Sequence, residues 1–111
     1  MEPRLKSEFW VKAHVRRCLS EGVSATIARR GDPDAGDILI KINRLDGTFS
    51  VLARAMRGDG RRIWIKGTGP EPVAESEADA YLTRQLKIDP DLWIVEIEDR
   101  AGRHFIDERV E

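Results

Sequence analysis

The segment that decides the fold reads ILIKINRLDGTFSVLARAM, from Ile38 to Met56. Isoleucine occupies every second position at its start, and Asp46-Gly47 divides it into two halves. Alternation with a period of two is typical of β-strands, and Asp-Gly is a strong signal for the turn of a hairpin. The segment therefore predicts two antiparallel strands joined by a short turn.

Strand-like alternation also occurs on both sides of this hairpin. It extends from Val23 to Arg30 before the hairpin and from Arg61 to Lys66 after it. Glycine, proline and aspartate at 31–36, and glycine and aspartate at 58–60, are turn-forming residues that link these runs to the hairpin. We therefore expect four successive strands joined by short turns, which is an antiparallel meander.

Two helices are predicted, one before and one after the meander. The first extends from Ser7, a suitable N-cap, to about Glu21. Its apolar stripe, which should face the core, contains Val11, His14, Val15, Cys18 and Leu19. The second helix extends from Ser76 to about Lys87, and Ser76 with Asp79 resembles a capping box.

The last part of the chain predicts a terminal β-hairpin. Leu92 to Glu98 forms one strand, and Arg103 to Asp107 pairs back as a last short strand. The predicted fold class is α+β, with both helices on one face of one sheet and residues 1–111 in a single domain. An alternative is a parallel crossover between the strands at 61–66 and 92–98, which would be right-handed if they share one sheet.

Length and composition restrict the classes of function. A chain of 111 residues suits one domain, and 41% apolar with 35% charged residues is typical of a compact, soluble protein. The 19 basic and 20 acidic side chains leave a net charge of −1, so no overall field attracts nucleic acid or anionic membrane. One cysteine cannot form an intramolecular disulfide, and no apolar run is typical of a signal peptide or membrane span. We therefore expect a cytoplasmic protein without a membrane partner.

Several stretches of the chain carry a family resemblance. They are Arg4 to Trp10, Arg29 to Gly36, Asp59-Gly60 followed by Trp64, and Asp89 to Phe105. In this order they are similar to a small bacterial family, found chiefly in alphaproteobacteria, that is known as domain of unknown function 1491. The resemblance implies a bacterial cytoplasmic protein. It implies no catalytic residues, since the family has no assigned activity.

The C-terminal stretch contains a candidate polar site formed by Glu96, Glu98, Arg103 and His104. The two glutamates lie two residues apart and therefore share one face of a strand, as general acid–base pairs and metal sites require. Together with Asp99 and His104, they would suit a small acid–base or metal-assisted enzyme. The alternative is an exposed strand face whose acids pair with nearby arginines.

Other polar residues admit a chemical and a structural interpretation. Asp32, Asp34 and Asp37 have oxygen ligands for Mg²⁺ or Ca²⁺, but the same loop composition is typical of a solvated turn. Cys18 and His14 lie on the apolar stripe of the first helix, where a buried structural role is expected. The sequence therefore identifies no metal-ligand set and no cofactor site.

Arginine pairs form a candidate basic patch. Its residues are Arg29, Arg30, Arg61 and Arg62. If strand pairing brings both pairs to the end of the sheet that holds Arg16-Arg17, they would attract RNA, phosphate or an acidic protein. The alternative is that these arginines are solvated and balanced by the many acidic side chains.

The sequence does not assign a function, but it ranks three classes. A non-enzymatic protein-interaction or assembly module comes first, because a clear fold pattern occurs without a complete catalytic set. Its partner would be another protein or a second copy, bound at free sheet edges and at the face bearing Ile94, Leu39 and Leu52. RNA or nucleic-acid binding through the arginine pairs comes second, and the small enzyme comes third.

Overall fold

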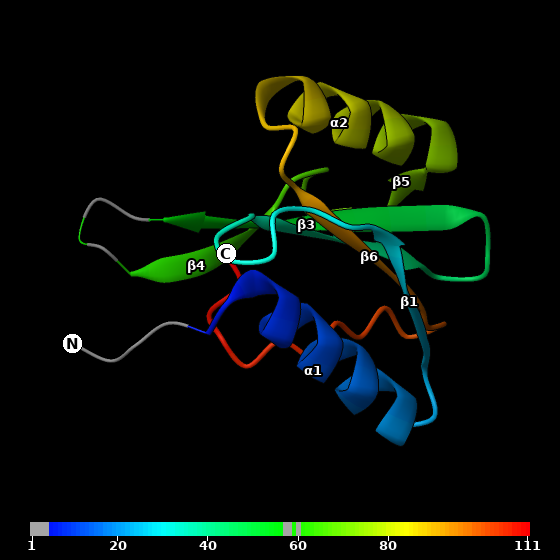
Figure 1. Cartoon of the computed structure of the whole chain (residues 1–111). Helices are drawn as coiled ribbons and strands as arrows, with labels where there is room; N and C mark the ends of the chain where they lie inside the picture. The colour runs from blue at the N-terminus through cyan, green and yellow to red at the C-terminus, as the bar shows by residue number, and fades with distance from the viewer. Residues whose placement is uncertain (1–4, 57–58, 60) are drawn as a thin grey trace.

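The computed structural model describes residues 5–56, 59 and 61–111. In this part of the chain, a sheet of six strands lies between two helices, α2 on one face and α1 on the other (Figure 1). The elements in chain order are α1 (Ser7–Ser20), β1 (Ser24–Arg29), β2 (Ile38–Asn43), β3 (Thr48–Met56), β4 (Arg62–Lys66), β5 (Val73–Ala74), α2 (Glu75–Ile88) and β6 (Trp93–Glu98). The predicted α+β class is confirmed.

The strand order departs from a simple meander at its first strand. The sheet has the order β1-β6-β2-β3-β4, and β5 pairs with β3. Strands β2, β3 and β4 form the predicted antiparallel meander, whereas β6 lies between β1 and β2. Strand β6 is antiparallel to β1 and parallel to β2, so its parallel neighbour is not β4 as in the alternative prediction. The turn predicted at 58–60 lies outside the described residues except for Asp59.

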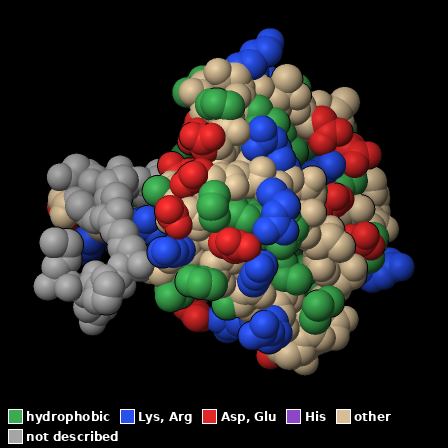
Figure 2. All heavy atoms as spheres, viewed as in Figure 1, with side chains coloured by type: hydrophobic (Ala, Val, Ile, Leu, Met, Phe, Trp, Pro, Cys, Tyr) green, Lys and Arg blue, Asp and Glu red, His purple; other side chains and the backbone are tan. Residues whose placement is uncertain are grey.

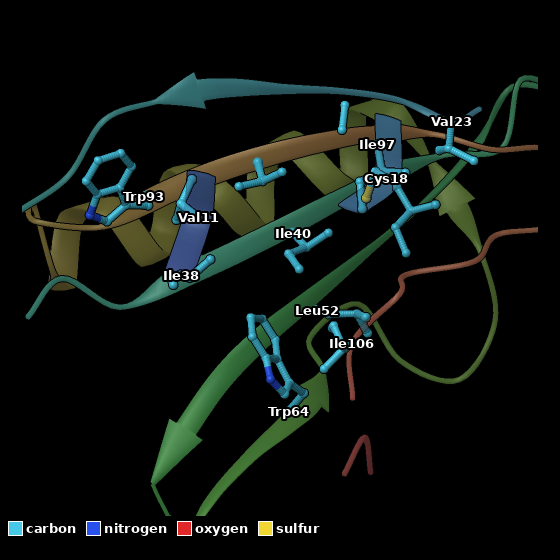
Figure 3. Packing of buried hydrophobic residues seen from close by; sticks show 13 residues of the cluster. Val11, Cys18, Val23, Ile38, Ile40, Leu52, Trp64, Trp93, Ile97 and Ile106 are labelled. Atoms are coloured by element: carbon cyan, nitrogen blue, oxygen red, sulfur yellow. The ribbon is translucent and has the colours of Figure 1, made fainter. Parts of the chain in front are cut away.

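Strand β6 takes this interior position because it carries buried apolar residues on both faces, three on one and Ile94 on the other. Three alternate residues pack in the cluster beneath α1, namely Trp93, Val95 and Ile97 (Figure 3). Ile94 packs in the second cluster, beneath α2. In β2, Ile40 joins the first cluster and Leu39 the second. Strands that are apolar on both faces need cover on both faces, so the prediction that both helices lie on one face is wrong.

The predicted terminal hairpin is also wrong. Residues 103–107 form no strand, and Phe105 has a φ of 60°, which breaks the extended backbone. The physical reason lies in β6, which already pairs on both of its edges, with β1 and with β2. A returning strand would have no edge to join. The segment instead crosses the α1 face, where Ile106 enters the core, and Val110 bridges to Trp64 of β4.

Neither helix has the side-chain cap that the sequence suggests. Helix α1 starts at Ser7 itself, whose hydroxyl donates a hydrogen bond to the carbonyl oxygen of Gly36 at 2.6 Å. Helix α2 starts at Glu75, and no side chain caps its N-terminus. Both starts are therefore fixed by contacts with the rest of the fold. Neither helix in the described part of the chain has the length and apolarity that a membrane span requires.

Burial predicts that the same substitution, isoleucine to alanine, changes the stability very differently at a core position and at an exposed position. Ile40 is fully buried in the centre of the sheet, whereas Ile88 is 79% exposed at the end of α2. We expect Ile40→Ala to lower the free energy of unfolding by about 2–5 kcal/mol, because it removes buried methyl groups and leaves a cavity. Ile88→Ala should change it by about 0.5 kcal/mol or less. Urea unfolding followed by circular dichroism measures both; similar losses would contradict the burial of β2.

Candidate functional site

The structure does not bring the four residues of the candidate polar site together. Glu96 lies opposite Lys41 in the pairing of β6 with β2, on the face that α2 covers, and Glu98 follows on the same face. His104 lies on the other face, where its carbonyl oxygen accepts a hydrogen bond from His14 of α1. The sheet therefore separates the two glutamates from the histidine, and the acid–base arrangement has no common cavity.

The remaining member of that set, Arg103, has a structural contact. Its guanidinium donates two hydrogen bonds to the buried carboxylate of Asp99, at 3.1 and 2.9 Å, and its backbone N–H donates a third at 2.7 Å. These bonds, the Arg103 side chain first, hold the pKa of Asp99 below its ordinary value. Arg103 and Asp99 thus fix the turn that follows β6, and Asp99 is committed to this ion pair rather than to His104.

A buried lysine that sequence reasoning missed occupies the α2 face. Lys41 donates hydrogen bonds to Glu75 at 3.0 Å and to Asp79 at 2.9 Å, and its ammonium lies 4.9 Å from the ring centre of Phe49. Burial lowers the pKa of Lys41, but the hydrogen bonds to Asp79 and Glu75 outweigh that effect and raise it overall. The signal in the sequence is a lysine within the apolar run of β2. This cluster attaches the N-terminal part of α2 to the sheet.

The acidic loop between β1 and β2 has the features of a turn. The carboxylate of Asp32 accepts hydrogen bonds from the backbone N–H groups of Asp34 and Ala35. Asp37 instead lies 3.7 Å from the guanidinium of buried Arg54. Among the described residues, no three His, Cys, Asp or Glu side chains are grouped as metal ligands would be.

The basic pairs reach the same end of the sheet but opposite edges. Arg29 ends β1 and donates to the carbonyl oxygen of Leu92 at 2.7 Å, while Arg62 starts β4, and three strands lie between β1 and β4. The adjacent arginines are paired with acids, Arg30 with Glu8 and Arg61 with Asp59. The pair Arg16-Arg17 lies in the second half of α1, toward the other end of the sheet, where Cys18 approaches Ile97 (Figure 3). A continuous basic patch for nucleic acid is therefore not formed by these pairs.

His14 and Cys18 are buried in α1, as their place on the stripe suggests. His14 stacks on Trp10 with 4.7 Å between ring centres, and burial lowers its pKa. Burial raises the pKa of the Cys18 thiol, which makes it a poor nucleophile. The fifth stripe residue, Leu19, differs from the prediction because it is 56% exposed.

Leu19 belongs to a groove beside the open edge of the sheet. The groove has a volume of about 280 Å³ and is lined by Lys12, Val15, Arg16, Leu19 and Ile27. Ile27 lies on β1, which is the outermost strand on this side and pairs only with β6 in the described part of the chain. A bulge between Ile27 and Arg29 ends the regular pairing of β1. The regular edge is thus Ser24 to Ile27, directly beside the groove.

The other edge of the sheet is covered. Trp64 of β4 donates its backbone N–H to Arg109 at 2.8 Å and accepts a hydrogen bond from Glu111 at 2.7 Å. The backbone N–H of Lys66 donates a third bond, to a main-chain oxygen of Glu111. The predicted contact face is covered as well: Leu39 and Ile94 lie under α2, and Leu52 packs in the core on the opposite face. These three residues therefore do not share one exposed contact face, so of the predicted contact surfaces only the edge of β1 remains.

Comparison with known families gives one match. The model of the family described as protein of unknown function, DUF1491, matches residues 5–107. That match extends from the start of α1 to the C-terminal segment, so it includes both helices and the whole sheet. Among curated proteins, none matches the chain.

Solved structures of similar proteins have the same fold. A crystal structure of a DUF1491 family protein from Caulobacter crescentus is 46% identical, covers 97% of this chain and 100% of its own, and has a TM-score of 0.86. An NMR structure of a DUF1491 family protein from the same organism is 45% identical over 99% of each chain, with a TM-score of 0.87. A solution structure from A. tumefaciens is 27% identical, covers 96% of this chain and 98% of its own, and has a TM-score of 0.77.

The two histidines predict a loss of stability in mild acid. Burial lowers the pKa of both His14 and His104 in the folded state. The unfolded state therefore binds protons first as the pH falls below about 6.5, and the stability that is fully present above that pH is progressively lost. We expect a smaller free energy of unfolding at about pH 5.5 than at about pH 7.5 by urea titration.

A double variant isolates the histidine contribution to this pH dependence. In His14→Gln, the amide can still donate to the carbonyl oxygen of His104, and in His104→Asn the side-chain oxygen can still accept from the backbone of Ile106. The double variant should show a weaker dependence between about pH 7.5 and about pH 5.5. An unchanged slope would mean that neither histidine is responsible.

Proposed function

The chain belongs to this family of unknown function, and we propose that it is a protein-interaction module that receives an extended segment of another protein along β1. The observation that carries the proposal is the open edge of β1 beside a groove that is both apolar and basic. Backbone N–H and C=O groups on an open edge form a ready template for an added strand. The bulge at the end of β1 limits this template to about four residues, Ser24 to Ile27.

The side chains around the edge define the chemistry of the partner. An added strand would direct every second side chain toward α1, where exposed Leu19 and half-buried Ile27 offer an apolar contact. Lys12 and Arg16 flank that contact, and Arg16 forms no ion pair in the described part of the chain. In Figure 2, basic and hydrophobic side chains lie side by side over α1. The partner segment should therefore alternate aliphatic with acidic residues.

Charge also favours a different protein over a second copy. If β1 paired with β1 of another copy about a twofold axis, the two α1 helices would lie on the same face of the joined sheet. The basic residues Lys12 and Arg16 of each copy would then face those of the other. Like charges in that position oppose association, whereas an acidic segment would be attracted.

The cellular setting that we propose is the bacterial cytoplasm. The one cysteine of the chain, Cys18, is a free and fully buried thiol. A free thiol is usual in reducing compartments. The partner segment would then come from a cytoplasmic protein.

Selection from a displayed library of random peptides tests the interaction. We expect enriched peptides in which aliphatic and acidic residues alternate, and we expect their binding to perturb the backbone amides of Ser24 to Ile27 in NMR spectra. Arg16→Glu and Leu19→Lys should each weaken binding by about fivefold or more. The matched control is Ile88→Lys, which changes an exposed residue on α2 and should leave binding unchanged.

Two results would overturn this function. The first is the absence of any enriched peptide that perturbs β1. The second is a dimer in sedimentation measurements that dissociates in Leu19→Lys, because a second copy would then occupy the edge.

A further inference from the structure

We propose that a cavity on the α1 face of the sheet binds a small organic anion, with an apolar body and one phosphate or carboxylate group. The cavity has a volume of about 390 Å³ and lies between the C-terminal segment and strands β2, β3 and β4. This volume falls in the range of small-molecule sites, about 300–1,000 Å³. The site is separate from the β1 edge, so neither proposal depends on the other.

The cavity results from the placement of α1. This helix packs mainly over β1 and β6 and reaches β4 through Trp10 on Trp64, so it leaves the part of the same face around Leu52 and Lys66 uncovered. The C-terminal segment crosses that region and closes it with Gly102, His104 and Val110. Buried Ile42 and Leu52 form an apolar floor (Leu52 is labelled in Figure 3).

Two cations line the cavity, and no acidic side chain does. They are Arg44, which follows β2, and Lys66, which lies opposite Leu52 in the pairing of β4 with β3. Neither of the two forms an ion pair with a carboxylate in the described part of the chain. The side chain of nearby Glu111 is bonded to Arg109 instead. In a chain with 20 acidic and 19 basic residues, a cavity with cations alone is a local departure from the average surface.

The guanidinium of Arg44 is held in place before any ligand arrives. It donates to the carbonyl oxygen of Ala101 at 3.0 Å and lies against the backbone of Gly102. A Cβ atom at position 102 would come within 2.6 Å of the guanidinium nitrogen, and the φ of 71° there also favours glycine. Gly102 thus provides the space that Arg44 occupies. A fixed guanidinium with further N–H donors is well suited to a phosphate or carboxylate.

Two neutral groups add hydrogen-bonding capacity. The Nδ1 atom of His104 accepts the backbone N–H of Ile106 at 2.9 Å, so the neutral ring carries its proton on Nε2 and can donate it. Burial lowers the pKa of His104 and favours that neutral form. Ser50, opposite Ile42 in the pairing of β3 with β2, contributes a hydroxyl that makes no side-chain hydrogen bond in the described structure. Two cations, two neutral donors and an apolar floor together match a singly substituted organic anion.

NMR titration of the full chain tests the site with three probes that share a phenyl ring. Phenyl phosphate and benzoate each carry an anionic group on a phenyl ring, and benzyl alcohol is the uncharged comparison. We expect phenyl phosphate or benzoate to cause saturable shifts at the amides of Ser50, Lys66 and residues 102–106. The tighter of the two identifies the preferred anionic group, and benzyl alcohol should bind more weakly than either.

A pair of matched double variants separates a specific site from general charge attraction. Arg44→Gln with Lys66→Gln should weaken binding of the preferred probe by about tenfold or more, while the spectrum remains that of a folded protein. Arg84→Gln with Lys87→Gln removes the same charge from exposed positions on α2 and should have no effect. The site is disproved if neither anion gives saturable shifts, if both double variants weaken binding equally, or if benzyl alcohol binds as tightly as the anions.

Discussion

The rest of the structure depends on the burial of β6 on all four sides. It has β1 on one edge and β2 on the other, and it contributes to a hydrophobic cluster on each face, so these two strands and both helices lie where they cover it. The strand is also the last one in the chain, and its pairing partners β1 and β2 precede it by roughly fifty residues or more. The sheet is therefore completed only when distant segments meet, a topology that generally folds slowly.

In both helices, polar contacts with other elements replace the side-chain caps that many helices have at their N-termini. Ser7 and Asp79 are typical capping residues, yet the first bonds to Gly36 and the second to Lys41. Each of these contacts joins a helix N-terminus to the region of β2, one from each side of the sheet. The position of both helices is thus coupled to the same strand, which explains why a chain with little local capping has well-defined layers.

Periodicity alone predicts the helices and β1 to β4 and β6 to within a few residues, because alternation and helical spacing are properties of neighbouring residues. Periodicity does not predict the order of the strands, because that order depends on which strands are buried on both faces. The available signal was Leu39 in β2 and Ile94 in β6, which are apolar residues on the face that α2 covers.

The residues of the candidate polar site are separated for a related reason. Glu96 and His104 are close in the chain but lie on opposite faces. The cavity that we propose for an anion combines Arg44, Ser50, Lys66 and His104 from separate segments, and only His104 belongs to a site predicted from the sequence.

One edge of the sheet is covered and the other is open, and this difference limits how large an assembly could grow. Residues 109–111 occupy the backbone groups of β4 at Trp64 and Lys66, whereas β1 has no such cover in the described part of the chain. A sheet with two open edges can add strands at both ends and extend into a fibre. With one edge closed, strand addition at β1 would stop after a single event, so the open edge could not propagate into an aggregate.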